Sequence, residues 1–151
     1  MGLRFHDLAS LPRVYDVLWC KFPLREAPRF PGPVARPALV VDATPVIDQS
    51  NGQRLGAVTV QYGGDFEAKN LPGNLLIVTQ DVRMLGLHKA TLFRMDLGNR
   101  RTLPWAEEYF VSQNYVRSQD IIAGSLTDDQ RTRMHDCFKQ RGLTFPIAPA
   151  L

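Results

Sequence analysis

The stretch Arg36-Pro37-Ala38-Leu39-Val40-Val41-Asp42 decides the fold, because its apolar run is typical of a buried strand and the segments around it can pair with it. Pro37 fixes its own φ angle and favours an extended conformation at the residue before it. The side chain of Arg36 is therefore held where the preceding loop joins the sheet. We expect this junction to present a fixed cation.

The loop before this strand, residues 23–33, contains four prolines. That is too many for a helix or an inner strand, because proline lacks the backbone N–H that both structures need. The loop also carries Arg25 and Arg29. We expect it to bring these two arginines near Arg36.

After the strand, Asn51-Gly52 stands between two apolar runs, and this pair is the strongest short-range signal for a β-hairpin. The strands on either side should therefore be antiparallel neighbours. The other elements follow from apolar alternation and from the turn residues between the runs. They are an N-terminal appendage (1–12), strands (14–22, 36–42, 55–62, 74–78 and 90–97), one helical turn (79–85), a basic continuation (100–104), a C-terminal helix (127–142) and a tail (143–151).

Residues 90–97 alternate along the whole of a predicted strand. Residues two apart on a strand point the same way, so Arg94 and Asp96 would share one face. Placing both of them inward would bury two charges, and we therefore expect them to form a charged pair on the open face. The residues expected to face the core are Thr91, Phe93, Met95 and Leu97.

The most secure helix begins at Thr127, which forms a capping box with Gln130. Its apolar stripe consists of Met134, Cys137 and Phe138, and Gly142 ends it. Short strands at close spacing followed by this helix, without βαβ alternation or repeats, predict a mainly β fold. We expect a single domain over residues 1–151, built as a small, strongly bent antiparallel barrel.

The composition is that of an ordinary globular chain, with 151 residues, 44% hydrophobic and 22% charged, and a net charge of +3 that favours an anionic partner only mildly. Cys20 and Cys137 lie far apart without metal-ligand spacing, so both are expected to be reduced structural thiols. The N-terminus lacks the pattern of a secretory signal, and no apolar stretch approaches the length of a membrane span. We therefore expect a cytoplasmic protein with no membrane contact.

Three blocks of the chain resemble, in order, the PemK/MazF toxins of toxin–antitoxin systems. Residues 15–23, a Pro/Gly loop and residues 36–41 are similar to the family's Gly-Asp-Val-Val-Trp-like strand, flexible loop and Arg-Pro-Val/Ala-Leu-Val. Residues 58–65 look like the Tyr-Gly-Thr-Ser segment of a PemK-like branch. Residues 86–97 and 103–105 are similar to that branch's Gly-Leu, Pro-Thr, Phe-Asp-Leu-Gly and Leu-Pro motifs.

This resemblance implies an SH3-like barrel, usually a homodimer, that cleaves single-stranded RNA without a metal or other cofactor. Family members use the substrate's own 2′-hydroxyl as nucleophile and leave a 2′,3′-cyclic phosphate and a 5′-hydroxyl. A cognate antitoxin inhibits them by placing its tail in the same groove. Contact with DNA is only indirect, through that antitoxin.

The resemblance also assigns residues. The arginine of the Arg-Pro motif falls on Arg36, and the Arg-x-Asp pair of some members falls on Arg94 and Asp96. The threonine of Tyr-Gly-Thr-Ser falls on Gly64, and Asp65 replaces the serine beside it. A hydroxyl that would bind phosphate or the 2′-hydroxyl is therefore missing from this chain.

Metal-free RNA cleavage requires a base for the 2′-hydroxyl, cations for the charge that grows on the phosphate, and a proton for the leaving 5′-oxygen. Asp96 is the candidate base, and the guanidinium groups of Arg36 and Arg94 suit the phosphate. His88 is a candidate proton donor, because imidazole changes charge near neutral pH. The candidate catalytic residues are Arg36, Arg94 and Asp96, and the candidate substrate-binding residues are Arg25, Arg29, Phe30, Gly64, Asp65, His88 and Thr91.

Each central residue also has a purely structural interpretation. Asp96 can form a plain surface salt bridge with Arg94, which contributes little to stability. Arg36 can hydrogen-bond to the backbone of its own loop, and His88 can be a solvated loop residue. Trp19 and Tyr62 fit the core better than base stacking, whereas Phe30 in the loop fits stacking.

Three functions remain open at this point. The first is a ribonuclease toxin, and the second is a non-catalytic barrel of the same fold that binds RNA or an acidic partner peptide. The first two functions differ in what Gly64 and Asp65 allow. If cleavage needs the missing hydroxyl, this chain can only bind. The third, an interaction domain with no nucleic-acid role, predicts no salt-dependent binding of RNA.

Overall fold

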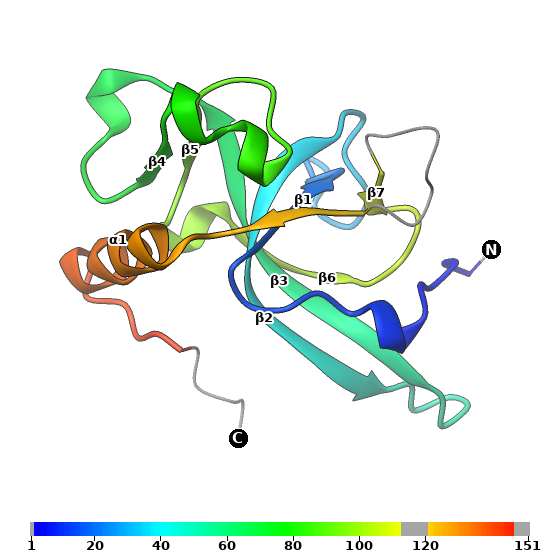
Figure 1. Cartoon of the computed structure of the whole chain (residues 1–151). Coiled ribbons are helices and arrows are strands. Elements are labelled where there is room, and N and C mark those ends of the chain that lie inside the picture. The colour runs from blue at the N-terminus through cyan, green and yellow to red at the C-terminus, as the bar shows by residue number, and fades with distance from the viewer. Residues whose placement is uncertain (1, 113–120, 147–151) are drawn as a thin grey trace.

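The structure of the protein, a computed structural model, describes residues 2–112 and 121–146. Met1 of the expected appendage and residues 147–151 of the expected tail lie outside them. The described chain forms one open antiparallel sheet with an α-helix near the C-terminus (Figure 1). The elements are β1 (Asp16–Cys20), β2 (Arg36–Ile47), β3 (Arg54–Asp65), β4 (Leu75–Ile77), β5 (Thr91–Phe93), β6 (Arg100–Pro104), β7 (Phe110–Val111), β8 (Ile122–Ser125) and α1 (Asp128–Gln140), with 3-10 turns η1 (Leu8–Ser10), η2 (Ala68–Asn70), η3 (Thr79–Asp81), η4 (Arg83–Leu85) and η5 (Leu97–Asn99).

Strands β2 and β3 form the hairpin that Asn51-Gly52 predicts, and their antiparallel pairing is confirmed. Gly52 has a φ angle of 71°, a left-handed value that glycine adopts without steric cost. The backbone N–H of Asp48 closes the turn by donating to the carbonyl oxygen of Gln53 at 2.8 Å. Both strands run further toward the turn than expected, and this end of the hairpin projects from the body of the molecule (Figure 1).

The rest of the sheet is assembled on this hairpin. One edge of β3 pairs with β2, and its other edge pairs with β6 along its middle and with β5 at its end. Strand β1 pairs with the start of β2 on one side and with β7 and β8 on the other. The register of β2 against β3 shifts between Val40 and Asp42, a bulge that increases the local twist.

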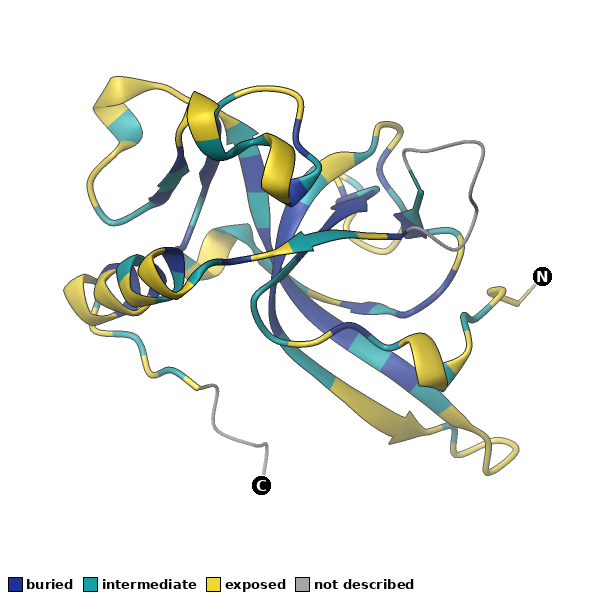
Figure 2. Ribbon diagram, viewed as in Figure 1, coloured by how far each residue is buried: buried dark blue, intermediate teal, exposed yellow. Residues whose placement is uncertain are grey.

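Strands β1 and β2 bury side chains on both faces of the sheet, which explains their nearly continuous apolar sequences. Successive residues of a strand point to opposite faces, so each strand contributes to two hydrophobic cores. The central part of the sheet is accordingly buried, whereas the end of the β2–β3 hairpin is exposed (Figure 2). The core beside α1 contains Val17, Trp19, Leu39 and Val41, and the core on the other face contains Leu18, Cys20, Ala38 and Val40.

The C-terminal helix α1 confirms its sequence signals. The Thr127 side chain accepts a hydrogen bond from the backbone N–H of Gln130, and the Gln130 side chain accepts one from the backbone N–H of Thr127. The predicted stripe of Met134, Cys137 and Phe138 is buried against the sheet. Over residues 2–112 and 121–146, no helix is long and apolar enough to cross a membrane.

Both cysteines are buried and free, which confirms the expectation of structural thiols. Cys20 belongs to the core that faces away from α1, and Cys137 belongs to the core beneath it. Burial raises the pKa of both thiols, because a thiolate is poorly solvated in an apolar environment.

The prediction of a strand over residues 90–97 is wrong beyond its first half, because β5 ends at Phe93. The backbone N–H of Arg94 still donates to the carbonyl oxygen of Tyr62 at 2.8 Å, and side chains from other segments take the backbone groups that follow. The backbone N–H of Met95 donates to Asn74 Oδ1 at 2.9 Å, and Gln61 Nε2 donates to the carbonyl oxygen of Arg94 at 2.7 Å. Thr91, Phe93 and Met95 are buried as expected, but Leu97 is 58% exposed.

Candidate functional site

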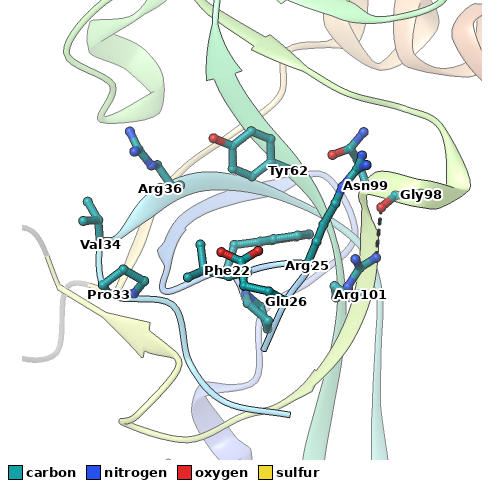
Figure 3. Close-up of a pocket in the computed structure, with 12 residues that line it drawn as sticks. Phe22, Arg25, Glu26, Pro33, Val34, Arg36, Tyr62, Gly98, Asn99 and Arg101 are labelled. Atoms are coloured by element: carbon teal, nitrogen blue, oxygen red, sulfur yellow. Dashed lines mark hydrogen bonds between the residues drawn. The ribbon is translucent and has the colours of Figure 1, made fainter. Parts of the chain in front are cut away.

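One cleft opens beside Tyr62, between the Pro-rich loop and the start of β6, and we call it the Tyr62 cleft (Figure 3). Its volume is about 330 Å³, at the lower end of the range for small-molecule sites. The rings of Phe22 and Tyr62 lie edge to face inside it, with centroids 5.3 Å apart. The lining residues are Phe22, Pro23, Leu24, Arg25, Glu26, Pro33, Val34, Arg36, Tyr62, Gly98, Asn99 and Arg101.

A second, smaller cleft of about 200 Å³ lies between the start of β2, the end of β3 and the segment before β5, and we call it the His88 cleft. The exposed imidazole of His88 packs against Trp19, with ring centroids 5.1 Å apart. The Trp19 indole N–H donates to the carbonyl oxygen of Gly86 at 3.2 Å, so the indole is fixed and mostly buried. The lining residues are Trp19, Ala35, Arg36, Pro37, Gly63, Gly64, Asp65, His88, Lys89 and Thr91.

Arg36 lines both clefts. It opens β2 opposite Cys20, its side chain is exposed, and no described residue forms a hydrogen bond or ion pair with its guanidinium. The structural alternative, in which Arg36 satisfies the backbone of its own loop, is therefore not what the structure shows. The guanidinium keeps its donors for a ligand.

Two glycines of the His88 cleft, Gly63 and Gly64, allow close packing by their neighbours. A Cβ at residue 63 would lie 2.7 Å from the carbonyl oxygen of Pro37, a distance that real side chains do not reach. A Cβ at residue 64 would lie 3.0 Å from Cε2 of Tyr62. The Tyr62 ring therefore lies close to the position where the resemblance expects a threonine.

Asp65 and Lys89 form an exposed ion pair at the rim of the His88 cleft, with Lys89 Nζ 2.8 Å from Asp65 Oδ1. The hydrogen bond from Lys89 and its charge lower the pKa of the Asp65 carboxyl, and Arg36 adds a smaller lowering. Exposed pairs of this kind contribute little to stability. The main consequence of this pair is that one carboxylate, Asp65, and two cations, Lys89 and Arg36, lie beside the same cleft.

Replacing Lys89 with alanine is expected to raise the pKa of the Asp65 carboxyl toward its ordinary value, as measured by the carboxyl ¹³C shift against pH. Because the folded-state pKa is the lower one, the pair stabilises the fold above the unfolded-state pKa, and this contribution is lost as the pH falls through the folded-state pKa. Lys69→Ala is the control, since it breaks the exposed Lys69–Glu67 pair elsewhere. The same Asp65 titration in both variants would contradict this assignment.

The structure does not bring Arg94 and Asp96 into either cleft, and it shows no ion pair between them. The Asp96 carboxylate instead accepts both of its hydrogen bonds from Asn99 Nδ2, at 2.9 and 3.1 Å. Nε of Arg94 is buried without a partner among the described residues. The prediction of an Arg94–Asp96 pair on one open face is therefore wrong, because the strand that would align them ends at Phe93.

The other predicted residues divide between the clefts and the surface. Arg25 lines the Tyr62 cleft, as expected, but Arg29 and Phe30 line neither cleft, and Phe30 is 67% exposed. Thr91 reaches the His88 cleft, but it is only 4% exposed and its hydroxyl donates to the carbonyl oxygen of Lys89 at 2.9 Å. The residues that the structure brings together around Arg36 are Arg25, Gly64, Asp65, His88 and Thr91.

Sequence reasoning missed four polar residues of the clefts: Glu26, Lys89, Asn99 and Arg101. Asn99 had a signal in its place three residues after Asp96, and Arg101 had one because it belongs to the basic run after the predicted strand. Its guanidinium lies over the Phe22 ring, with Cζ 5.6 Å from the ring centroid, and Nη1 donates to the carbonyl oxygen of Gly98 at 3.0 Å. The pairing of β6 with β3 puts it there, and no local pattern predicts that contact.

Comparison with known proteins adds nothing to this description, so the site is described from its geometry. No family model, no curated protein and no solved structure matches this chain. Among residues 2–112 and 121–146 there is also no group of three or more His, Cys, Asp or Glu side chains arranged to hold a metal ion.

Proposed function

We propose that this protein is a metal-independent endoribonuclease for single-stranded RNA, of the PemK/MazF type that its sequence resembles. One observation carries the proposal: the exposed Arg36, whose guanidinium has no hydrogen-bond or ion-pair partner among residues 2–112 and 121–146, lines both clefts. A phosphate bound there would have one nucleotide in each cleft. The SH3-like barrel, a homodimer, a cytoplasmic location and inhibition by a cognate antitoxin belong to the same proposal.

The two clefts offer the groups that single-strand binding requires. Arg25 and Arg101 accompany Arg36 along the Tyr62 cleft, and Lys89 follows at the His88 cleft. These cations match a phosphate backbone, and Tyr62 offers an aromatic surface for a base. The same cations suit the acidic tail of an antitoxin, which would compete with RNA for the clefts.

The proposed reaction transfers the phosphoryl group within the RNA. The 2′-hydroxyl oxygen forms a bond to phosphorus, the bond from phosphorus to the 5′-oxygen breaks, and a 2′,3′-cyclic phosphate and a 5′-hydroxyl result. Asp65 accepts the 2′-hydroxyl proton, and His88 gives a proton to the leaving oxygen. Arg36 stabilises the charge on the phosphate oxygens. Asp65 takes the role first expected of Asp96, because Asp65 lines the His88 cleft and Asp96 lines neither cleft.

The test incubates the purified protein with a mixed-sequence RNA in EDTA and analyses the ends of the products. We expect 2′,3′-cyclic phosphate and 5′-hydroxyl ends, and a strong loss of cleavage in Asp65→Asn. Asp129→Asn is the matched control, because Asp129 also forms an exposed ion pair, with Arg133 on α1. Intact RNA at high protein concentration, or equal loss in both variants, would contradict the proposed reaction.

Gly64 favours a second candidate function, non-catalytic binding of RNA or of an acidic peptide in the same clefts. The family hydroxyl is absent at this residue, and the Tyr62 ring crowds the space beside it. This candidate predicts salt-dependent binding of single-stranded RNA without any cleavage.

A further inference from the structure

Asn99 presents a fixed polar atom to the Tyr62 cleft, of which it forms part of the wall (Figure 3). A carboxylate only accepts hydrogen bonds, so the two short contacts with Asp96 require Asn99 to turn its NH₂ group toward Asp96. The Asn99 carbonyl oxygen Oδ1 has no hydrogen-bond donor among the described residues. Asn99 therefore offers an acceptor, and Asp96 prevents the amide from turning over.

Glu26 provides a second acceptor in the same cleft. Figure 3 shows its carboxylate pointing into the space beside the Phe22 ring. In the part of the chain that the structure describes, no hydrogen bond or ion pair engages this carboxylate. A negatively charged group is unexpected in a cleft proposed to bind a polyanion, unless that group accepts hydrogen bonds from donor atoms of the ligand.

Donors line the same cleft. Arg101 uses Nη1 for the carbonyl oxygens of Gly98 and Arg100, at 3.0 and 2.8 Å, and no described residue accepts a hydrogen bond from its Nε or Nη2. The guanidinium of Arg25 has no partner among the described residues. The cleft thus combines two acceptors, the guanidinium groups of three arginines, and the aromatic pair of Phe22 and Tyr62.

We propose that the Tyr62 cleft selects guanine in single-stranded RNA, an inference that rests on the proposed RNA function. Guanine has adjacent donors at N1 and N2 for Glu26 and Asn99, and acceptors at O6 and N7 that suit an arginine. Adenine would place its amino group against the arginines, and cytosine and uracil each have a single donor position on this edge. Asp96 is then a positioning residue, which acts through the orientation of Asn99.

The probes are 2′-O-methyl nonanucleotides of uridine with G, A, C or U at the centre, which cannot be cleaved because the nucleophilic hydroxyl is blocked. Fluorescence anisotropy is expected to give roughly 10- to 100-fold tighter binding of the G-containing strand. Glu26→Gln removes the negative charge and replaces one carboxylate oxygen by an NH₂ donor, which should bring the preference for G below about threefold. Glu67→Gln, the same charge change outside the clefts, should preserve it.

Asp96→Asn tests the positioning role of Asp96. An asparagine at this position both donates and accepts, so the Asn99 amide is free to turn over and the preference for G should fall while the uridine strand binds as before. Equal, salt-dependent binding of all four strands by the unmodified protein would overturn this inference alone. A preference for G that persists in both Glu26→Gln and Asp96→Asn would also overturn it. Binding of no strand at any salt concentration would overturn the proposed RNA function as well.

Discussion

Replacing Arg36 with alanine is expected to reduce cleavage of single-stranded RNA by roughly 100-fold or more, the effect typical of losing one preorganised donor to a transition-state oxyanion. The reason is its position, since Arg36 lines both clefts and no residue that the structure describes hydrogen-bonds to its guanidinium. The side chain is exposed, so its truncation should leave the midpoint of thermal unfolding nearly unchanged. The measurement is the initial rate of appearance of 5′-hydroxyl ends.

Arg54→Ala is the matched control for this variant. Arg54 opens β3 on the projecting part of the hairpin, is exposed, and lines neither cleft. Both substitutions remove one positive charge, so a purely non-specific attraction to RNA would weaken equally in both. Equal rates in the two variants would contradict the role given to Arg36.

Replacing Gln61 with leucine is expected to lower the free energy of unfolding by about 3 kcal/mol, because it leaves several buried polar groups without partners. The Gln61 side chain is fully buried. Its Nε2 donates to the carbonyl oxygens of Arg94 and Asp96 at 2.7 and 3.1 Å, and its Oε1 accepts from Nε of Arg100. Urea unfolding should show a lower midpoint with the same dependence on urea concentration.

Arg100 makes this substitution especially costly. Its guanidinium lies over the Phe138 ring, with Cζ 5.5 Å from the ring centroid, and Nη2 is buried without a partner among the described residues. Burial lowers the pKa of Arg100, so this cation depends on the neutral acceptor that Gln61 provides. Gln53→Leu on the exposed hairpin turn is the control. A similar loss of stability in both variants would contradict the stabilising role of the Gln61 hydrogen bonds.

The elements that local patterns specify were predictable from the sequence. The Asn51-Gly52 turn and the Thr127–Gln130 capping box each depend on a few adjacent residues, and both are present. Residues 90–97 show the limit of this reasoning. Their alternation is that of a strand, but side chains of Gln61 and Asn74, from remote segments, replace the ladder after Phe93.

The candidate site was predictable at Arg36, because Pro37 and the loop composition fix that residue locally. The neighbours of Arg36 depend on long-range pairing: β2 pairs with β3, and β3 pairs with β5, which brings Asp65 and His88 beside it. The prediction of an Arg94–Asp96 pair failed because both the alternation and the resemblance assumed an unbroken strand. The Asp96–Asn99 contact spans a single short turn, and an Asp three residues before an Asn is a signal that could have suggested it.

The most direct test of the central claim is a ¹H–¹⁵N spectrum of the protein titrated with an uncleavable 2′-O-methyl single-stranded RNA. We predict that the largest shift changes fall on the two clefts that share Arg36, including the amides of Arg36, Tyr62 and His88. A third cleft, between α1 and the segment around Asn74 and β4, provides an internal comparison. Changes confined to that cleft, or no changes at RNA concentrations that saturate known single-strand binders, would contradict the claim that Arg36 lies at the centre of an RNA-binding site.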